Sequence, residues 1–358
     1  MATTQPPRTI DTPMSTVDLY CGVGGLTHGF TREGVSVVAG IDVDASCKYA
    51  YEKNNRALFI NKSVEDLTAT EIKALYPAGH VKVLVGCAPC QPFSRYSIRP
   101  SPGEKWKLLT RFSDFVRDVE PEVVSMENVP DLLKHSVFAE FLDVLAAENY
   151  NVSYSVVNCI HYGIPQTRSR LVLFASRLGE IKMLPATHTK QQHQTVRMTI
   201  ENLEPLEAGH ISNSDPLHRA SALSALNLKR IVASRQGGSW RDWPEELRLN
   251  CHKKKTGASF GSVYGRMRWD EPSPTMTTQC NGIGNGRFGH PEQDRAISFR
   301  EAALFQTFPL DYSFIDPEVG FKSDDTARHI GNAVPVRLGE IIARTIKLHV
   351  EEHHDGKR

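Results

Sequence analysis

The chain has 358 residues, 40% of them hydrophobic, which is enough to bury a sizeable core in one large domain or in two. Its 42 Lys and Arg nearly balance 41 Asp and Glu, which excludes a globally basic nucleic-acid binder and confines any such surface to a local patch. The sequence holds no 18-residue apolar run, so no membrane span is predicted. We expect a cytoplasmic, nucleoid-associated protein whose residues 1–14 form a disordered leader and whose seven cysteines are free thiols.

Apolar, β-branched runs alternate with helical patterns along the first half of the chain. Four such runs end in the polar strings DLYCG, IDVD, APCQ and MENV. The alternation predicts an α/β fold with a doubly wound, mostly parallel sheet. In such a sheet the active residues lie beyond the carboxyl ends of the strands. The four polar strings are therefore expected to share one cleft.

The composition changes near residue 181, where the chain becomes richer in Pro, Gly, Gln, His and Asn and loses its clear periodicity. The final stretch becomes an amphipathic helix again. We therefore predict that a second, smaller domain is inserted into the first. The expected boundaries are a catalytic domain over 15–185, an inserted domain over 186–296, a hinge over 297–328 and a C-terminal helix over 329–358 that returns to the catalytic domain.

A glycine turn follows the first apolar run. In Cys21-Gly22-Val23-Gly24-Gly25 the glycines allow close backbone approach to a ligand, and the next helix presents free N–H groups. The same pattern also suits a tight strand–helix turn without a ligand. Asp42, at the end of the next run, has two interpretations as well: it binds a ribose, or it caps a helix.

Cys87 and Cys90 have the spacing of a redox or zinc pair. Zinc is disfavoured because the other five cysteines are single and scattered, and no metal site is expected. A redox pair should open a helix, but the Gln-Pro after Cys90 favours extended chain. A nucleophilic cysteine needs an acid or base and a cation nearby, which Glu127 and the arginines of QTRSR could supply. The spacing alone leaves the redox and nucleophile readings open.

Six strings occur in a set order: DLYCGVGG, GCAPCQPFS, ENVP, QTRSR, RWDEPSPTMTT and HIGNAVPV. Together they resemble the ordered motifs of the DNA cytosine-5 methyltransferase family, over about residues 15 to 190 and 265 to 345. The resemblance implies an S-adenosylmethionine-binding α/β sheet with an inserted target-recognition domain. It further implies a bacterial type II modification enzyme that methylates carbon 5 of a flipped-out cytosine in a short DNA sequence.

The resemblance also assigns residues to the cofactor. Tyr20, Gly22, Gly24 and Leu26 would line S-adenosylmethionine and its product S-adenosylhomocysteine, with Asp18 supporting the turn. The other cofactor residues implied are Asp42, Val43, Ser63, Val64, Pro89, Asn332 and Val334. Relatives often place a tryptophan at the position of Val43 and an aspartate near Ser63-Val64, where this chain offers the shifted Asp66.

By the same resemblance Cys90 is the nucleophile, and Glu127, Arg168 and Arg170 surround the target base. A thiolate adding at carbon 6 makes carbon 5 reactive, while a protonated carboxyl at N3 relieves the charge on the ring. Arg170 would bind O2, and Arg168 would orient Glu127 or the base. The cytosine must leave the duplex for this chemistry.

The expected partner is double-stranded DNA, bound by a monomer, with a cognate restriction endonuclease acting separately. Two regions suggest DNA contacts: the stretch after the nucleophile, with the candidates Ser94 and Arg95, and the locally basic inserted domain, with Arg230, Arg235 and Arg241. Two alternatives are an RNA cytosine-5 methyltransferase and a catalytically silent DNA-binding relative. The RNA branch carries a Cys-Phe-Thr string that is absent here, and the silent relative is disfavoured because the catalytic residues are all present.

Overall fold

The computed structural model describes residues 13–89, 106–254 and 260–355. Seven strands form one sheet in the order β3-β2-β1-β4-β5-β8-β6. All pairings from β3 to β5 are parallel, whereas β8 is antiparallel to both of its neighbours. The strands are β1 (Met14–Leu19), β2 (Ser36–Asp42), β3 (Leu58–Asn61), β4 (Val81–Gly86), β5 (Val123–Asn128), β6 (Asn151–Asn158) and β8 (Ser169–Ser176).

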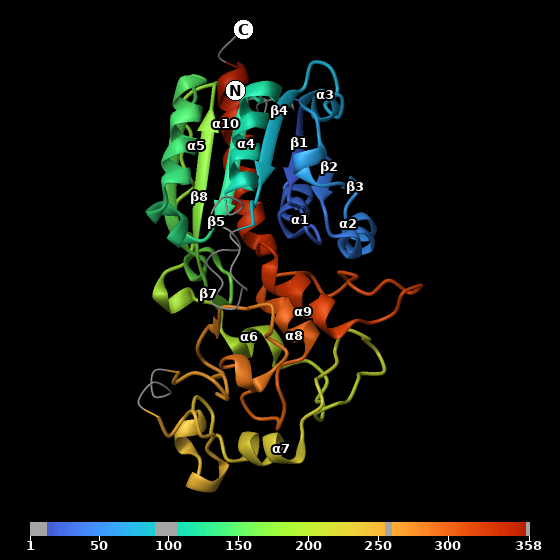
Figure 1. Cartoon of the computed structure of the whole chain (residues 1–358), viewed down its shortest axis with the longest axis vertical. Helices are drawn as coiled ribbons and strands as arrows, with labels where there is room; N and C mark the ends of the chain where they lie inside the picture. The colour runs from blue at the N-terminus through green and yellow to red at the C-terminus, as the bar shows by residue number, and fades with distance from the viewer. Residues whose placement is uncertain (1–12, 90–105, 255–259, 356–358) are drawn as a thin grey trace, which may run out of the picture.

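Helices cover both faces of the sheet, as Figure 1 shows, and bury a hydrophobic cluster on each side. Helices α4 and α5 pack on one face together with α3, and α1 and α10 pack on the other. The strands read as continuous apolar runs because both faces are covered. The helices are α1 (Gly25–Arg32), α2 (Lys48–Asn54), α3 (Ala69–Lys73), α4 (Lys107–Val119), α5 (Ser136–Ala147) and α10 (Val336–Asp355).

Helix α10 brings the end of the chain back onto the first helix. A Cβ added to Gly29 would lie 2.5 Å from the backbone nitrogen of Glu340, and one added to Gly25 would lie 2.3 Å from the carbonyl of Val334. Only glycine permits such close backbone approach. The first glycine turn and the segment before α10 are thereby held together.

The second lobe lies below the sheet in Figure 1 and consists mainly of loops and short helices. A two-stranded parallel ladder of β7 (Gln166–Thr167) and β9 (Ser273–Pro274) joins it to the catalytic lobe. The segment predicted as a hinge contains α8, whose residues are largely buried and which packs against α6 and α9. The helices here are α6 (Val196–Ile200), α7 (Ala225–Val232), α8 (Phe299–Phe305) and α9 (Ser323–Asn332).

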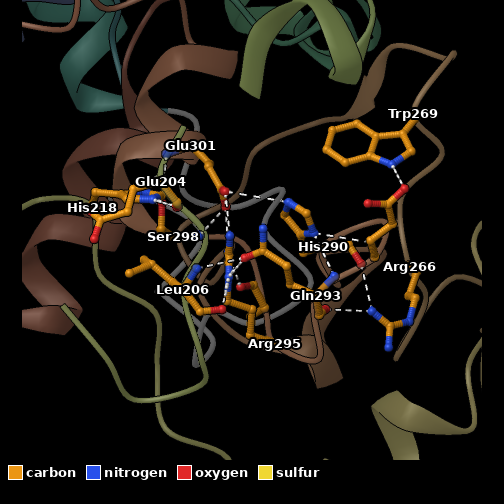
Figure 2. A network of polar contacts seen from close by, with 12 residues as sticks. Glu204, Leu206, His218, Arg266, Trp269, His290, Gln293, Arg295, Ser298 and Glu301 are labelled. Atoms are coloured by element: carbon orange, nitrogen blue, oxygen red, sulfur yellow. Dashed lines mark hydrogen bonds and ion pairs between the residues drawn. The ribbon is translucent and has the colours of Figure 1, made fainter. Parts of the chain in front are cut away.

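A buried polar network organises this lobe in place of extensive secondary structure (Figure 2). Arg295 is fully buried and makes a bidentate pair with Glu301, with N–O distances of 2.7 and 2.8 Å. Although burial opposes the charge, Arg295 lowers the pKa of Glu301 to about 2. Glu301 also closes a capping box with Ser298 at the start of α8. The Arg295–Glu301 pair stabilises the loops of this lobe because both charged groups are fully hydrogen-bonded within the protein.

Candidate active site

The four polar strings lie at the carboxyl ends of adjacent strands. Strands β2, β1, β4 and β5 are consecutive neighbours in the sheet, and all run in the same direction. Their ends are Asp42, Leu19, Gly86 and Asn128. The sheet therefore places the glycine turn, the acidic turn, the Pro-Cys segment and the ENV segment along one edge.

The glycine turn and Asp42 are directly bonded. The Asp42 carboxylate accepts hydrogen bonds from the backbone N–H of Gly22 and of Asp44, each at 2.9 Å. The helix cap, by contrast, is Asp44, whose side chain accepts from the backbone N–H of Ser46. A carboxylate can accept about four hydrogen bonds, so Asp42 retains capacity for ribose hydroxyls.

Gly22 and its neighbours form a cradle for a ligand. A Cβ added to Gly22 would meet no atom within 4 Å, whereas one added to Gly24 would collide with Asn55 and Tyr51. Both glycines have positive φ, and Tyr20 does too, at φ 59°. The hydroxyl of Tyr20 donates to the carbonyl of Leu108, which anchors this strained residue. Open space at Gly22 fits a bound cofactor.

Asp18 is buried beneath this turn. One of its oxygens accepts the hydroxyl hydrogen of Thr27 at 2.7 Å, and the other has no partner within the described part of the chain. Burial, reinforced by the nearby Asp42 charge, raises the pKa of Asp18 to about 7. A free buried oxygen in this position could accept a hydrogen bond from a ligand in the cradle.

The other predicted cofactor residues differ in whether their side chains are accessible to a ligand. The side chains of Leu26, Val64 and Val334 are buried in the hydrophobic clusters, so their backbones are what remains for a ligand. Val43 is 71% exposed beside the turn. Ser63 accepts from the backbone N–H of Glu65 and thus begins a short 3₁₀ helix.

A cavity of about 460 Å³ opens next to the Val64 turn. Its lining includes Glu65, Trp106 and Arg111. The guanidinium of Arg111 donates to the carbonyls of Val64 and Leu67, which ties α4 to this turn. Pro89 and Asn332 are both exposed; Pro89 follows the end of β4, and Asn332 is the last residue of α9.

The ENV segment contacts the segment that leads to Cys90. The side-chain amide of Asn128 donates to the carbonyl of Ala88 at 3.1 Å. Ala88 is buried and precedes Cys90 by two residues in the sequence. Cys90 itself, with Ser94 and Arg95, lies outside the described residues.

Glu127, on β5, forms a buried ion pair. The Nε of Arg170 is 2.8 Å from Oε1 of Glu127, and both side chains are largely buried. That oxygen has no aligned hydrogen-bond partner within the described ranges. Burial, reinforced by the charge of the nearby Glu127 carboxylate, raises the pKa of the Cys87 thiol well above its ordinary value. Cys87 therefore stays protonated beside the acid.

Arg168 has different partners from those expected. Its guanidinium donates to the backbone carbonyls of Met276, Gly331 and Ala333, at 3.0 to 3.4 Å. It is 3% exposed, and burial lowers its pKa to about 9. Arg170, rather than Arg168, is the arginine that the structure places against Glu127. Arg168 instead ties three segments of the chain together.

One group of potential metal ligands occurs within the described ranges, Asp44, Cys47 and His329. Arg328 forms an ion pair with Asp44, and Ser46 hydrogen-bonds to both Asp44 and His329. A guanidinium at the carboxylate opposes a cation, so hydrogen bonding and ion pairing explain this group without a metal.

The candidate DNA-binding arginines fall into two kinds. Arg235 is strongly exposed and lies 3.3 Å from Asp242. Arg230 instead donates to the carbonyl of Leu247 and stacks over Trp243. Arg241 lies over the ring of Trp240, 5.6 Å from its centroid.

The fold and the ligand cradle define the class of S-adenosylmethionine-dependent methyltransferases. Residues 14–348 match the model of the C-5 cytosine-specific DNA methylase family. The chain belongs to this family, and it is a DNA cytosine-5 methyltransferase whose methyl donor is S-adenosylmethionine. In the described ranges, no helix has the length and apolar character needed to cross a membrane.

Two curated relatives and one solved structure illustrate the match. The chain is 55% identical to the type II methylase M.HgiDII of Herpetosiphon aurantiacus, over 96% of this chain and 97% of the relative. It is 30% identical to the type II methyltransferase M1.BsuMI of Bacillus subtilis, over 91% and 78%. The S. pombe Dnmt2 methyltransferase has the same fold, with a TM-score of 0.62 at 17% identity, covering 95% of this chain and 99% of that one.

Two polar residues at the junction of the lobes are not predicted by the sequence motifs. Gln166 is the first residue of QTRSR, where no role is predicted for it, and Gln306 lies within the predicted hinge. Both are fully buried, and their side-chain amides are bonded to each other. A visible signal was the Ser298-x-x-Glu301 pattern, which predicts a helix start in the supposed hinge.

Proposed function

We propose that this enzyme methylates one cytosine in a specific short DNA sequence through a covalent bond from Cys90 to carbon 6 of the base. The observation that carries the proposal is the bond from Asn128 to the carbonyl of Ala88. It ties the strand that bears Glu127 to the segment that leads to Cys90. The acid and the nucleophile of the reaction therefore come from two segments joined at one strand edge.

The groups around the base have complementary tasks. Cys90, as thiolate, attacks carbon 6, and Glu127 donates a proton at N3, which keeps negative charge from accumulating on the ring. Arg170 lies against Glu127 and can turn its remaining donors toward O2. Oε1 of Glu127 is ion-paired with Arg170 but accepts no aligned hydrogen bond within the described residues, so the carboxyl group keeps capacity for a contact to the base.

The cofactor would bind at the glycine turn, where Gly22 leaves space, the Asp42 carboxylate would accept the ribose hydroxyls and Asp18 offers a free oxygen. S-adenosylmethionine, when bound, supplies an electrophilic methyl group for carbon 5. A base then removes the proton from carbon 5, and the Cys90 sulfur leaves by elimination. Water must be kept from the thiolate during these steps.

Target recognition falls to the second lobe, and the product protects the DNA of the host against a cognate restriction endonuclease that acts separately. The names of the relatives M.HgiDII and M1.BsuMI as type II enzymes support this part. We infer that the protein acts as a monomer on double-stranded DNA, since each turnover concerns one flipped base.

Bisulfite sequencing of DNA from cells that express the protein tests the proposal. One short motif should be protected at one cytosine, and the Cys90→Ala variant should leave the DNA unmodified. Methylation scattered without sequence context would contradict the site-specific reading. Labelled methyl transfer to tRNA, with none to DNA, would favour the RNA methyltransferase instead.

A further inference from the structure

Two buried glutamines form an interlocked pair where the lobes meet. The side-chain N–H₂ of Gln166 donates to Oε1 of Gln306 at 2.8 Å and to the carbonyl of Phe305 at 3.0 Å. Its oxygen accepts the backbone N–H of Met276 at 2.7 Å. Both side chains are 0% exposed. Each amide is thus fully engaged within the protein.

Gln306 carries the connection onward to the segment before α10. Its N–H₂ donates to the carbonyls of Ile330 and Ala333, at 2.6 and 3.0 Å. Arg168 donates to the carbonyls of Gly331 and Ala333. The carbonyls of Gly331 and Ala333, the residues on either side of Asn332, therefore accept hydrogen bonds from buried side chains. Asn332 itself is exposed.

The two ends of this chain of bonds lie at the two halves of the proposed site. At one end, Gln166 in β7 and Arg168 directly precede β8, the strand that places Arg170 against Glu127. At the other end, the 330–334 segment carries Asn332 and contacts the glycine turn through Gly25 and Val334. A buried polar network in which every group is hydrogen-bonded is rigid. A movement of the Arg170 strand therefore either is prevented or moves the 330–334 segment with it.

We propose that Gln306, bonded to Gln166, is a positioning residue that couples the cofactor segment 330–334 to the strand that holds Arg170. Cofactor binding and target-base binding then strengthen each other, since both select the same arrangement of this junction. The inference rests on the proposed function, because it takes Asn332 as a cofactor residue and Arg170 as a base contact. Two apolar side chains could fill the same space, but they could not set the direction of the three backbone carbonyls and the one backbone N–H that the glutamines bind.

The test is a measurement of reciprocal affinity on the full chain. The dissociation constant of S-adenosylhomocysteine is measured by calorimetry with and without a duplex containing the target sequence. The ratio of the two constants should be about fivefold or more in the wild type. Gln306→Glu keeps the acceptor for Gln166 but loses both donated bonds, and it should bring the ratio close to one. Gln306→Met, with no hydrogen bonds, should do the same.

Gln293→Met is the matched control. Gln293 is an amide of the second lobe that accepts from Leu206 and Arg295 and makes no bond to the junction residues in the described part of the chain. It should keep the wild-type ratio. The proposal is overturned if the wild type itself shows no coupling, if both Gln306 variants keep the wild-type ratio, or if Gln293→Met loses it equally.

The experiment distinguishes failure of the Gln306 proposal from failure of the proposed function. A wild type that methylates one cytosine but shows no coupling would overturn the role of Gln306 and leave the activity standing. Absence of methylation in the bisulfite experiment would contradict the proposed function itself. If Gln306→Met does not fold, the isosteric Gln306→Glu and the wild-type ratio still decide the question.

Discussion

The Nε of Arg170 lies 2.8 Å from Oε1 of Glu127, in a position where both side chains are largely buried. Arg170 comes from the antiparallel strand β8, and Glu127 from its neighbour β5. The pair joins the ENV and QTRSR motifs, which lie about 40 residues apart in the sequence. Loss of either partner leaves a buried charge without compensation.

Glu127→Gln should slow methyl transfer by roughly 10²–10⁴-fold, because an amide cannot deliver a proton to N3. Cofactor affinity should change little, since Glu127 lies on the base side of the site. Single-turnover transfer of labelled methyl groups measures the first effect, and calorimetry with S-adenosylhomocysteine measures the second. Equal rates for wild type and variant would remove Glu127 from the chemistry.

Asp42→Ala should weaken S-adenosylhomocysteine binding by about 1.5–3 kcal/mol, through the loss of a charge-assisted ribose contact. The loss of the bond to the N–H of Gly22 adds to the effect, because the turn is less well held. Asp143→Ala, an exposed change on α5, is the control and should bind as the wild type does. If both variants bind alike, Asp42 serves only the turn.

Asp18 predicts a pH dependence of stability in the cofactor-free protein. Its pKa is raised from 3.8 to about 7 on folding, so the native state holds a proton that the unfolded state has lost. The contribution of Asp18 to the free energy of unfolding is therefore largest below about pH 4. It falls as the pH rises to 7, by at most about 4 kcal/mol.

Asp18→Asn removes this titration and keeps an acceptor for the hydroxyl of Thr27. Urea unfolding at pH 5 and at pH 8 should show the wild type losing more stability between the two pH values than the variant. Identical losses would mean that Asp18 is charged in the folded protein at both.

Arg235 and Arg230 should separate DNA contact from structure. Arg235→Ala should weaken DNA binding and lower the slope of log K against log salt by about one, because one phosphate contact is lost. Arg230→Ala should instead lower thermal stability, since its guanidinium bridges Leu247 and stacks on Trp243 and Tyr264. Fluorescence anisotropy over a salt series, with melting curves, distinguishes the two. An unchanged salt slope for Arg235→Ala would exclude it as a phosphate contact.

The gathering of the four polar strings at the carboxyl ends of the strands could be predicted because its signals are local. Each apolar run ends in a polar string, and parallel strands bring their carboxyl ends together. Asp42, Gly22 and Glu127 lie at this edge as expected. The family match confirms the fold and the reaction that the ordered motifs predicted.

The role of Arg168 could not be predicted from its motif. Its carbonyl partners Met276 and Gly331 lie more than 100 residues away, and backbone carbonyls have no signature in a sequence. The same holds for Gln306, whose burial depends on the packing of short elements in a loop-rich lobe. Periodicity is informative for long elements and fails for helices of five to seven residues such as α6 and α8.

We propose that Cys90 forms the bond to the target base, and a suicide substrate tests this role most directly. DNA with 5-fluorocytosine at the target cytosine should trap the wild type covalently after methyl transfer, because fluorine cannot leave carbon 5 as a proton does. Cys90→Ala should form no adduct, whereas Cys87→Ala, which removes a protonated thiol near Glu127, should still be trapped within about tenfold of the wild-type rate. Denaturing electrophoresis with labelled DNA, followed by mass spectrometry of the adducted peptide, reads the result. An adduct that persists in Cys90→Ala, or one that disappears only in Cys87→Ala, would contradict the assignment.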